Sequence, residues 1–262
     1  MIDDVDVSAF RSDGFVVLRA AFESGRLSRE VNDALADGYR DAPMNTGSAG
    51  NLFWYVPMMC ERTPQSLALV DALAGPATQL LDRAVIPVRA KGTRYLGGTS
   101  WHRDSDLDVA TVGFAAYLEP LDSHNGALRV LPGSHRVLPT ESPSGVPAEG
   151  SLVGYAIETD PGDMIVFDER LWHASSGGAE RRQWRVDFVA DPSTPAEEDQ
   201  IRSYFAGIFQ PGWDGGYDVD RYPSYGAHWR ASAKPWVERL RDLGAIERAE
   251  REEAAVRAKR QA

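Results

Sequence analysis

The beginning of the chain carries the apolar spacing of helices. Apolar residues recur every four positions across residues 24–40, at Leu27, Val31, Leu35 and Tyr39. This period predicts an amphipathic helix, and a second helix, rich in Leu and Ala, is predicted over residues 64–82. We expect Gly75-Pro76 to break or kink the second helix, because proline has no N–H to donate within it. Ahead of both, residues 7–18 predict a helical start that runs into a strand from Phe15 to Leu18.

From about residue 85 the pattern changes to short apolar runs separated by Gly, Pro, Asn and Asp. The runs that we predict as strands are residues 84–89, 111–118, 127–131, 154–158, 164–167 and 184–190. Strands at this spacing, with turn residues between them, are typical of an antiparallel sandwich or barrel. Helices first and strands after predict a mainly β protein with a helical buttress, in the α+β class.

The strand pattern ends near residue 192. Aromatic residues, Gly and Pro follow with little periodicity, and we expect them to cover one end of the barrel. Helical periodicity begins at Pro235, and residues 245–262 are almost wholly charged residues and alanine. We expect this last stretch to be a solvated or partly disordered helix; the alternative is that it pairs with a second copy of the chain in a homodimer.

These boundaries predict one domain over residues 1–262. It has a helical part at 1–84, a barrel at about 85–192, and an aromatic cover with a charged helical end at 193–262. Residues 136–151 are rich in Pro, Gly and Ser, which predicts an exposed loop that could act as a lid.

Composition narrows the class of protein. The formal net charge is -11 and the isoelectric point is near 5.0, which argues against nucleic acid or an anionic membrane as a partner. No apolar run reaches the roughly 18 residues of a membrane-spanning helix, and the acidic start lacks the features of a signal peptide. The single cysteine, Cys60, excludes an internal disulfide and is interpreted as a small buried residue. We expect a cytoplasmic protein that acts on a small molecule.

Two of the five histidines lie in contexts typical of metal ligands. In Trp101-His102-Arg103-Asp104 the imidazole and the carboxylate are two positions apart, and on a strand such residues face the same side. His173 follows a predicted strand and a turn. His102, Asp104 and His173 therefore predict a facial triad of two histidines and one carboxylate, which binds Fe(II) and leaves positions open for a keto acid and O₂.

A keto acid with a second carboxylate needs a cation at the far end of its pocket. Arg185 lies twelve residues after His173 in a predicted strand, and a guanidinium can hold a carboxylate with two parallel hydrogen bonds. We infer that Arg185 faces the barrel interior together with Asp187. Arg181 and Arg182 are alternatives, but their stretch is polar and turn-like, and we expect them to be exposed.

Four segments, in this order, resemble signature motifs of the phytanoyl-CoA dioxygenase family. They are the entry strand Ser12–Leu18, the first metal motif Trp101–Asp104, the central block Asn125–His135, and the second metal motif Leu171–His173 with Ser175. Arg185 falls where the family keeps its 2-oxoglutarate arginine. The resemblance implies a double-stranded β-helix, a cupin-like jelly-roll barrel backed by helices. It also implies that Ser175 hydrogen-bonds the co-substrate alongside Arg185.

The triad and the resemblance together predict an Fe(II)- and 2-oxoglutarate-dependent dioxygenase. We expect it to hydroxylate an unactivated C–H of a small polar metabolite or natural-product intermediate, with release of succinate and CO₂. Because Asp104 is present, halogenation is not expected. The alternatives are a cupin-like metal protein that needs no keto acid, and a non-catalytic binding protein on the same barrel.

Residues that recognise the substrate are encoded less directly. The candidates are Trp54, Arg94, Trp101, Arg103 and His228, and Lys91 and Asp106 add charges that suit a polar or zwitterionic substrate. The alternative for Trp54 is core packing, and for the charged residues a surface pattern. Of the other histidines, His135 is interpreted as a stabiliser of its turn and His124 as an exposed turn residue.

Overall fold

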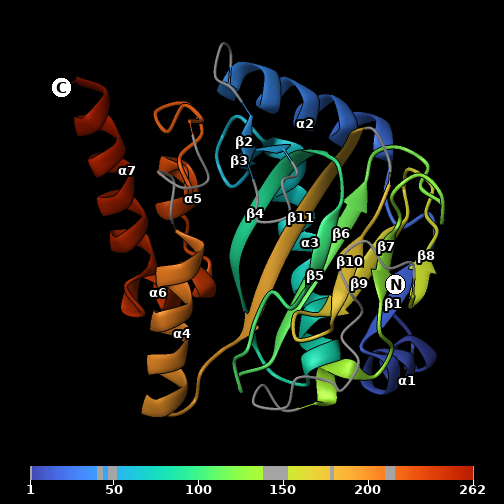
Figure 1. Cartoon of the computed structure of the whole chain (residues 1–262). Coiled ribbons are helices and arrows are strands. Elements are labelled where there is room, and N and C mark those ends of the chain that lie inside the picture. Colours follow the sequence, from blue (N-terminus) through green and yellow to red (C-terminus); the bar gives the residue numbers. More distant parts are fainter. Residues whose placement is uncertain are drawn as a thin grey trace.

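Two antiparallel sheets form the centre of the molecule (Figure 1). The computed structural model describes residues 2–39, 44–46, 52–137, 153–177, 180–209 and 216–261. Within them, the larger sheet has the order β1 (Phe15–Leu18), β9 (Met164–Asp168), β6 (Thr111–Tyr117), β11 (Glu180–Ala190), β4 (Val85–Leu96), β3 (Leu52–Pro57) and β2 (Asn45–Thr46). The smaller has the order β5 (Thr99–His102), β10 (His173–Ser175), β7 (Leu128–Val130) and β8 (Tyr155–Ile157).

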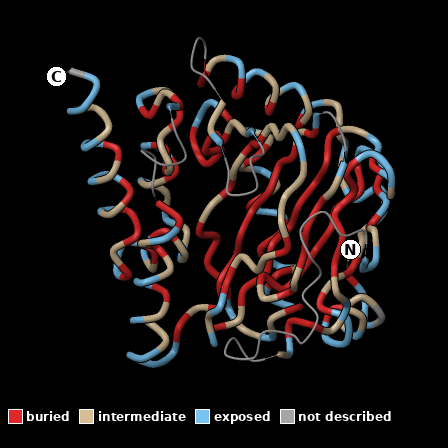
Figure 2. The backbone as a smooth tube through the Cα atoms, in the orientation of Figure 1, coloured by how far each residue is buried: buried red, intermediate tan, exposed pale blue. Residues whose placement is uncertain are grey.

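The order of the strands along the chain identifies the topology. From β4 to β11 the chain passes repeatedly between the two sheets, and apolar residues from both, such as Ile165 and Val130, form one buried cluster. This is a jelly-roll barrel, so the predicted fold is confirmed. Burial is concentrated along the strands (Figure 2).

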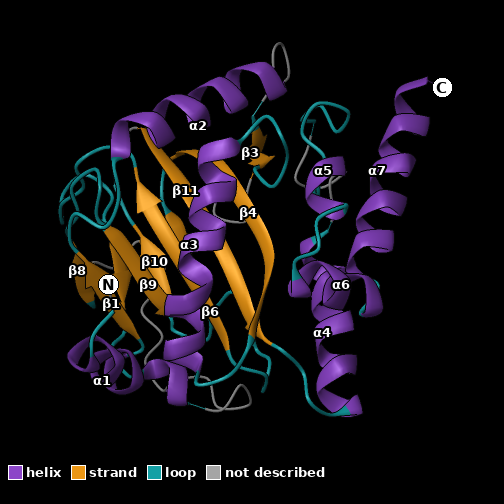
Figure 3. Cartoon of the chain, turned by 180° about the vertical axis from the view of Figure 1, so that it is seen from behind, coloured by secondary structure: helices purple, strands orange, loops and turns teal. Residues whose placement is uncertain are grey.

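Helices cover the outer face of the larger sheet. They are α1 (Asp4–Asp13), α2 (Ser24–Tyr39) and α3 (Pro64–Leu81), and α3 lies along β4 and β11 (Figure 3). Trp184 on β11 is fully buried beneath α3, where its indole N–H donates to the Ser66 hydroxyl at 2.7 Å. The predicted break at Pro76 is wrong, because α3 continues through this residue as one helix.

Between residues 181 and 187 of β11 and between residues 89 and 95 of β4, every second residue faces the barrel interior, and these inner residues are polar. The paired inner residues are Arg181 with Tyr95, Gln183 with Thr93, Arg185 with Lys91, and Asp187 with Arg89. We call these eight residues the polar ladder. The outer residues of β11, such as Trp184 and Val186, pack on the helices. This alternation explains why both strands extend beyond the apolar runs predicted at 84–89 and 184–190.

The C-terminal part forms a helical group beside the barrel, and its helix α6 contacts β4 (Figure 1). It contains α4 (Pro195–Ile208), α5 (Ala227–Arg230), α6 (Pro235–Asp242) and α7 (Ala245–Gln261). The expectation of a solvated or disordered end is wrong for the described residues, because Ile246 and Ala249 of α7 are buried and α7 contacts α4 and α6. The sequence reading also missed α4, although Thr194 caps it by accepting the Glu197 N–H at 3.2 Å.

Two further expectations concern a loop and a membrane-spanning helix. The predicted loop 136–151 falls largely outside them, from residue 138 onward. Among the helices of the described residues, none combines the length and the apolar character that crossing a bilayer requires.

Candidate metal centre

Two neighbouring strands of the smaller sheet bring His102 and His173 together. The two residues are direct cross-strand partners at the ends of β5 and β10, and their ring centroids are 4.2 Å apart. Because cross-strand partners place their side chains on the same face, two histidines that are distant in sequence point to one spot.

Asp104 completes the cluster from a bend just beyond β5. The expectation that it lies on a strand is wrong; its N–H instead donates to the Glu169 carbonyl at 2.9 Å. Asp104 Oδ1 is 3.6 Å from His102 Nε2, and its Oδ2 is 3.3 Å from His173 Nε2. One donor atom from each residue lies within 4.8 Å of the other two. These three donors can therefore reach one ion.

Both imidazoles are oriented by backbone carbonyls. His102 Nδ1 lies 2.7 Å from the Ser100 carbonyl and His173 Nδ1 lies 2.8 Å from the Leu171 carbonyl. A carbonyl only accepts, so each Nδ1 carries the proton and each Nε2 lone pair faces the cluster. Burial lowers the pKa of His173, which favours the neutral form, whereas Asp104 raises the pKa of His102 despite its burial, and a bound cation would displace that proton. Two neutral imidazoles and one carboxylate fit a divalent iron ion.

Arg185 lies on the inner face of β11, as inferred, but its guanidinium is held by three carboxylates. Nη1 donates to Asp104 Oδ2 at 2.6 Å, Nη2 donates to Glu169 Oε1 at 2.7 Å, and Nε donates to Asp187. Burial alone would raise the pKa of Asp104, but Arg185 and then His173 hold it well below its usual range. Arg185 thus keeps the metal-binding carboxylate ionised and fixes its position.

Arg181 lies on the same face of β11, four residues before Arg185. The expectation that it is exposed is wrong, because only 2% of its surface is accessible. Its guanidinium donates to the carbonyls of Gly126 at 2.8 Å and Gly97 at 2.6 Å. No carboxylate of the described residues pairs with it, so its charge is not neutralised within this part of the protein. Arg182 faces the opposite side and pairs with Glu119.

A cavity of about 80 Å³ joins the metal donors to the polar ladder. Besides the three donors, it is lined by Lys91, Tyr95, Thr99, Tyr117, Leu128, Phe167, Ala174, Ser175, Arg181, Gln183 and Arg185. Ser175, which the resemblance suggested, donates its hydroxyl to Thr99 Oγ1 at 3.2 Å. The cavity therefore has a metal end, at Asp104, and a second polar end, at Arg181 and Ser175.

Two of the predicted substrate residues lie on the far side of the larger sheet. Trp54 stacks on Tyr39 of α2 with ring centroids 5.2 Å apart, and Arg94 covers Trp54 and pairs with Glu180. Both are outer residues of their strands, so neither lines the cavity. The structure therefore does not bring these two predicted substrate residues to the metal donors.

The other three predicted substrate residues also lie outside the lining of the cavity. Trp101 points away from its neighbour His102 and lies close to Gly154. Arg103 donates to the Val137 carbonyl at 3.2 Å and lies over the Trp172 ring. His228 is on α5, and 91% of its side chain is exposed. Of the charged residues predicted to suit a substrate, only Lys91 lines the cavity.

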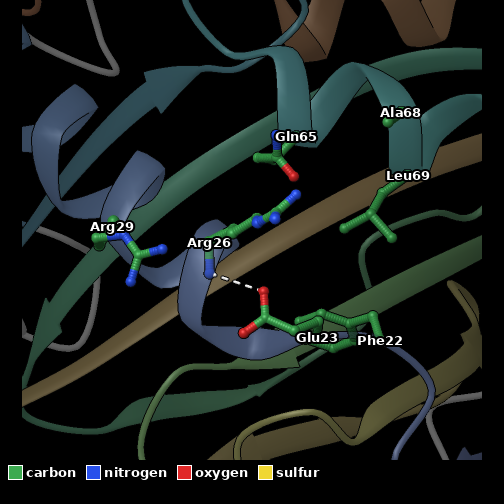
Figure 4. A pocket seen from close by; sticks show the side chains of 7 residues that line it. All are labelled: Phe22, Glu23, Arg26, Arg29, Gln65, Ala68 and Leu69. Atoms are coloured by element: carbon green, nitrogen blue, oxygen red, sulfur yellow. Dashed lines mark hydrogen bonds between the residues drawn. The ribbon is translucent and has the colours of Figure 1, made fainter.

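The remaining histidines and a second hollow take no part in the cluster. His135 is buried in a short 3₁₀ turn near the Arg11 carbonyl, while His124 is exposed. A hollow of about 460 Å³ lies between the start of α2 and α3 (Figure 4). It is lined by Phe22, Glu23, Arg26, Arg29, Gln65, Ala68 and Leu69, none of which belongs to the cluster of His102, Asp104 and His173. We therefore place the site in the smaller cavity.

A jelly-roll barrel that holds two histidines and a carboxylate beside a polar cavity defines the class of non-haem iron proteins with a facial triad. The family comparison is consistent with this class. The chain belongs to the phytanoyl-CoA dioxygenase (PhyH) family, whose model matches residues 10–183.

Individual relatives cover less of the molecule. The protein named dioxygenase andF of Emericella variicolor is 34% identical over 92 residues, which are 35% of this chain and 30% of that protein. The match thus spans about a third of the length of that relative.

Two solved structures are similar to most of the fold. EctD from S. alaskensis, solved with 2-oxoglutarate and 5-hydroxyectoine, is 25% identical with a TM-score of 0.55, and the match covers 72% of this chain and 77% of that one. The epimerase SnoN, in complex with Fe3+, alpha ketoglutarate and nogalamycin RO, has a TM-score of 0.59 over 72% of this chain and 83% of that one. At 15% identity, the SnoN likeness shows the fold alone.

Proposed function

We propose that the protein is an Fe(II)- and 2-oxoglutarate-dependent dioxygenase that hydroxylates a C–H bond of a small polar molecule. The observation that carries this proposal is the convergence of His102, Asp104 and His173 within 4.8 Å, with both Nε2 lone pairs directed at the cluster. Membership of the PhyH family supports the reaction class, and EctD was solved with the same co-substrate.

Each end of the cavity suits one end of 2-oxoglutarate. His102, Asp104 and His173 would hold the iron, which when bound supplies the activation of O₂ coupled to oxidative decarboxylation of the keto acid. At the other end, Arg181 and Ser175 would hold the distal carboxylate. The sequence favoured Arg185 for this role, but three internal carboxylates already occupy its guanidinium, which supports Arg181 in its place.

The other role of the protein residues is to bind the co-substrate and the substrate and to position them at the metal. The reaction R–H + 2-oxoglutarate + O₂ gives R–OH, succinate and CO₂, so no net proton is taken from or given to the protein. Arg185 holds the Asp104 carboxylate in the orientation that ligation needs. Buried residues such as Phe167 and Leu128 limit water beside the reacting centre.

The substrate class rests on the cavity lining. Its polar residues, including Lys91, Tyr95 and Gln183, suit a small polar metabolite or natural-product intermediate better than a long acyl chain. This remains our expectation for the substrate, and the homodimer and the cytoplasmic location likewise stay predictions.

An anaerobic titration of the protein with Fe(II) and 2-oxoglutarate tests the reaction class. We expect a weak visible charge-transfer band in the wild type and no band in Asp104→Ala. In the presence of O₂, slow succinate release should depend on both additions. Absence of iron binding would support the non-catalytic alternative, and turnover without 2-oxoglutarate would support the cupin-like alternative.

The same titration shows whether Arg181 or Arg185 binds the distal carboxylate of 2-oxoglutarate. Arg181→Met should raise the 2-oxoglutarate concentration for half-maximal band intensity by about ten- to a hundredfold, because it removes charge-assisted hydrogen bonds of about 1.5–3 kcal/mol. Arg182→Met is the matched control, since this neighbour faces the other side of the sheet. If Arg185→Met weakens 2-oxoglutarate binding and Arg181→Met does not, the distal carboxylate is held by Arg185 instead.

A further inference from the structure

Lys91 is a charged residue of the cavity that the proposed chemistry does not use. It lies on the inner face of β4, is paired in register with Arg185, and lines the same cavity as His102, Asp104 and His173. Its side chain therefore opens toward the reacting centre and away from the helices on the outer face.

The Lys91 ammonium lacks a partner among the residues that the structure describes. Its one contact of this kind is with the face of the Tyr55 ring, 5.7 Å from Nζ to the centroid. The carboxylate nearest in the ladder, Asp187, already accepts from Arg185 and from two nitrogens of Arg89, at 2.8 and 3.0 Å. The other cations of the ladder have acceptors, so Lys91 differs from its neighbours.

The surroundings of the Lys91 ammonium are electrostatically unfavourable for its charge. Burial, then the charges of Arg89 and Arg185, lower the pKa of Lys91 to about 8, while Asp187 and Asp104 oppose the shift. At neutral pH the ammonium is still mostly protonated. An enclosed cation with no carboxylate in direct contact is costly, and such a cost is typical of positions that bind a ligand.

Lys91 lies far along the strands from Arg181, the residue proposed to hold the distal carboxylate of 2-oxoglutarate. Lys91 is level with Arg185, and Arg185 is four residues from Arg181 along β11. At about 3.3 Å per residue, the backbone positions of Lys91 and Arg181 are therefore roughly 13 Å apart along the strand direction. One keto-acid end goes to the metal and the other to Arg181, so the charge of Lys91 is left for a third carboxylate.

We propose that Lys91 binds a carboxylate of the organic substrate, which makes the substrate a small organic acid. This inference rests on the proposed function, because it assigns both carboxylates of 2-oxoglutarate elsewhere. The ammonium would orient the acid so that a nearby C–H faces the metal donors. Neutralisation of Lys91 on binding would also couple substrate entry to completion of the site.

Ligand-observed NMR tests the inference without turnover. The protein is loaded under anaerobic conditions with Mn(II), whose paramagnetism broadens the lines of molecules near the site, and with 2-oxoglutarate. The probes are acetate, benzoate and N-acetyl amino acids, each measured beside its primary amide. We expect at least one acid to be broadened more than its amide, with its affinity at least about tenfold weaker in Lys91→Met. Lys91→Arg should keep the preference, and Lys259→Met, on the exposed side of α7, serves as the matched control.

The outcomes separate the inference from the proposed function. Equal binding of acids and amides by the wild type, or an acid preference that survives in Lys91→Met, would overturn the role of Lys91. A tenfold weaker 2-oxoglutarate titration in Lys91→Met would overturn it as well, by assigning Lys91 to the co-substrate. Absence of the Fe(II)–2-oxoglutarate band in the wild type would instead refute the proposed function. Lys91→Gln, compared by circular dichroism, guards against misfolding of the Met variant.

Discussion

Replacing Arg185 by Met removes the shared partner of three carboxylates and should destabilise the protein strongly. Asp104 is 23% exposed at its side chain, so solvent screens its loss. Glu169 and Asp187 are 0% and 1% exposed, and water cannot replace the guanidinium there. Burial raises the pKa of Glu169 to about 8, whereas Arg185 and then Arg89 lower the pKa of Asp187 despite its burial. The size of the effect therefore depends mainly on the ionised Asp187.

The two buried carboxyl groups keep other partners after the substitution. Asp187 still accepts from Arg89, and Glu169 still accepts from the Tyr204 hydroxyl at 3.0 Å. Breaking a buried ion pair by removing one partner costs about 3–5 kcal/mol. For a chain of this size, about 2–4 °C per kcal/mol converts this to a fall in Tm of roughly 6–20 °C.

Thermal unfolding of the metal-free protein, followed by far-ultraviolet circular dichroism at neutral pH, measures the change. Arg202→Met is the control, because Arg202 is 44% exposed and lies 3.4 Å from Glu198, so we expect less than about 1 kcal/mol. Adding Glu169→Gln to Arg185→Met should recover little of the loss, because burial and then the Asp187 charge raise the pKa of Glu169 to about 8 and leave it largely uncharged at neutral pH. A fall in Tm no larger than that of the control would refute the reasoning.

Three further predictions concern stability and use the same unfolding measurement. Ser66→Ala should cost about 1–3 kcal/mol, because it leaves the buried Trp184 N–H without its acceptor; a loss below about 0.5 kcal/mol, the lower limit for a net hydrogen bond, would contradict this. Lys91→Met should stabilise the protein by about 1–3 kcal/mol below its folded pKa of about 8, and the gain should shrink as pH rises from 8 toward 10.5, where the wild-type lysine loses its charge penalty. Ile246→Ala should cost about 2–4 kcal/mol and exposed Arg251→Ala almost nothing, whereas equal small effects would mean that α7 is not packed.

The sequence predicted the barrel well because turn residues punctuate its strands. It predicted less well the two strands that matter most for the cavity. In β4 and β11 the inner residues are polar, so the predicted strands stopped at Arg89 and began at Trp184. Polar residues at every second position, such as Arg181, Gln183 and Arg185, were the available signal.

The metal donors could be proposed from their spacing and motifs, but the surrounding residues could not. Which arginine is available to bind a ligand depends on Asp104, Glu169 and Asp187. These three residues accept hydrogen bonds from Arg185 and come together only in the folded chain. Trp54 was a reasonable pocket residue by composition, yet strand parity directs it to α2. Alternation along a strand shows which residues share a face, but it does not show which structure covers that face or which residue pairs with a charge.

Because the inner residues of β4 and β11 are polar, the site depends on the helices that pack on the outer face of these strands. Arg181 and Arg185 are buried at the cost of desolvation, and the inner face of these strands offers little apolar packing in return. The outer face of the same strand supplies it: Trp184, Val186 and Phe188 are each 0% exposed, and full burial of such a side chain contributes about 1.5–3 kcal/mol. The hydrophobic core that stabilises β11 therefore lies between the sheet and its helices, while the barrel interior on this side is free to hold charge beside a metal.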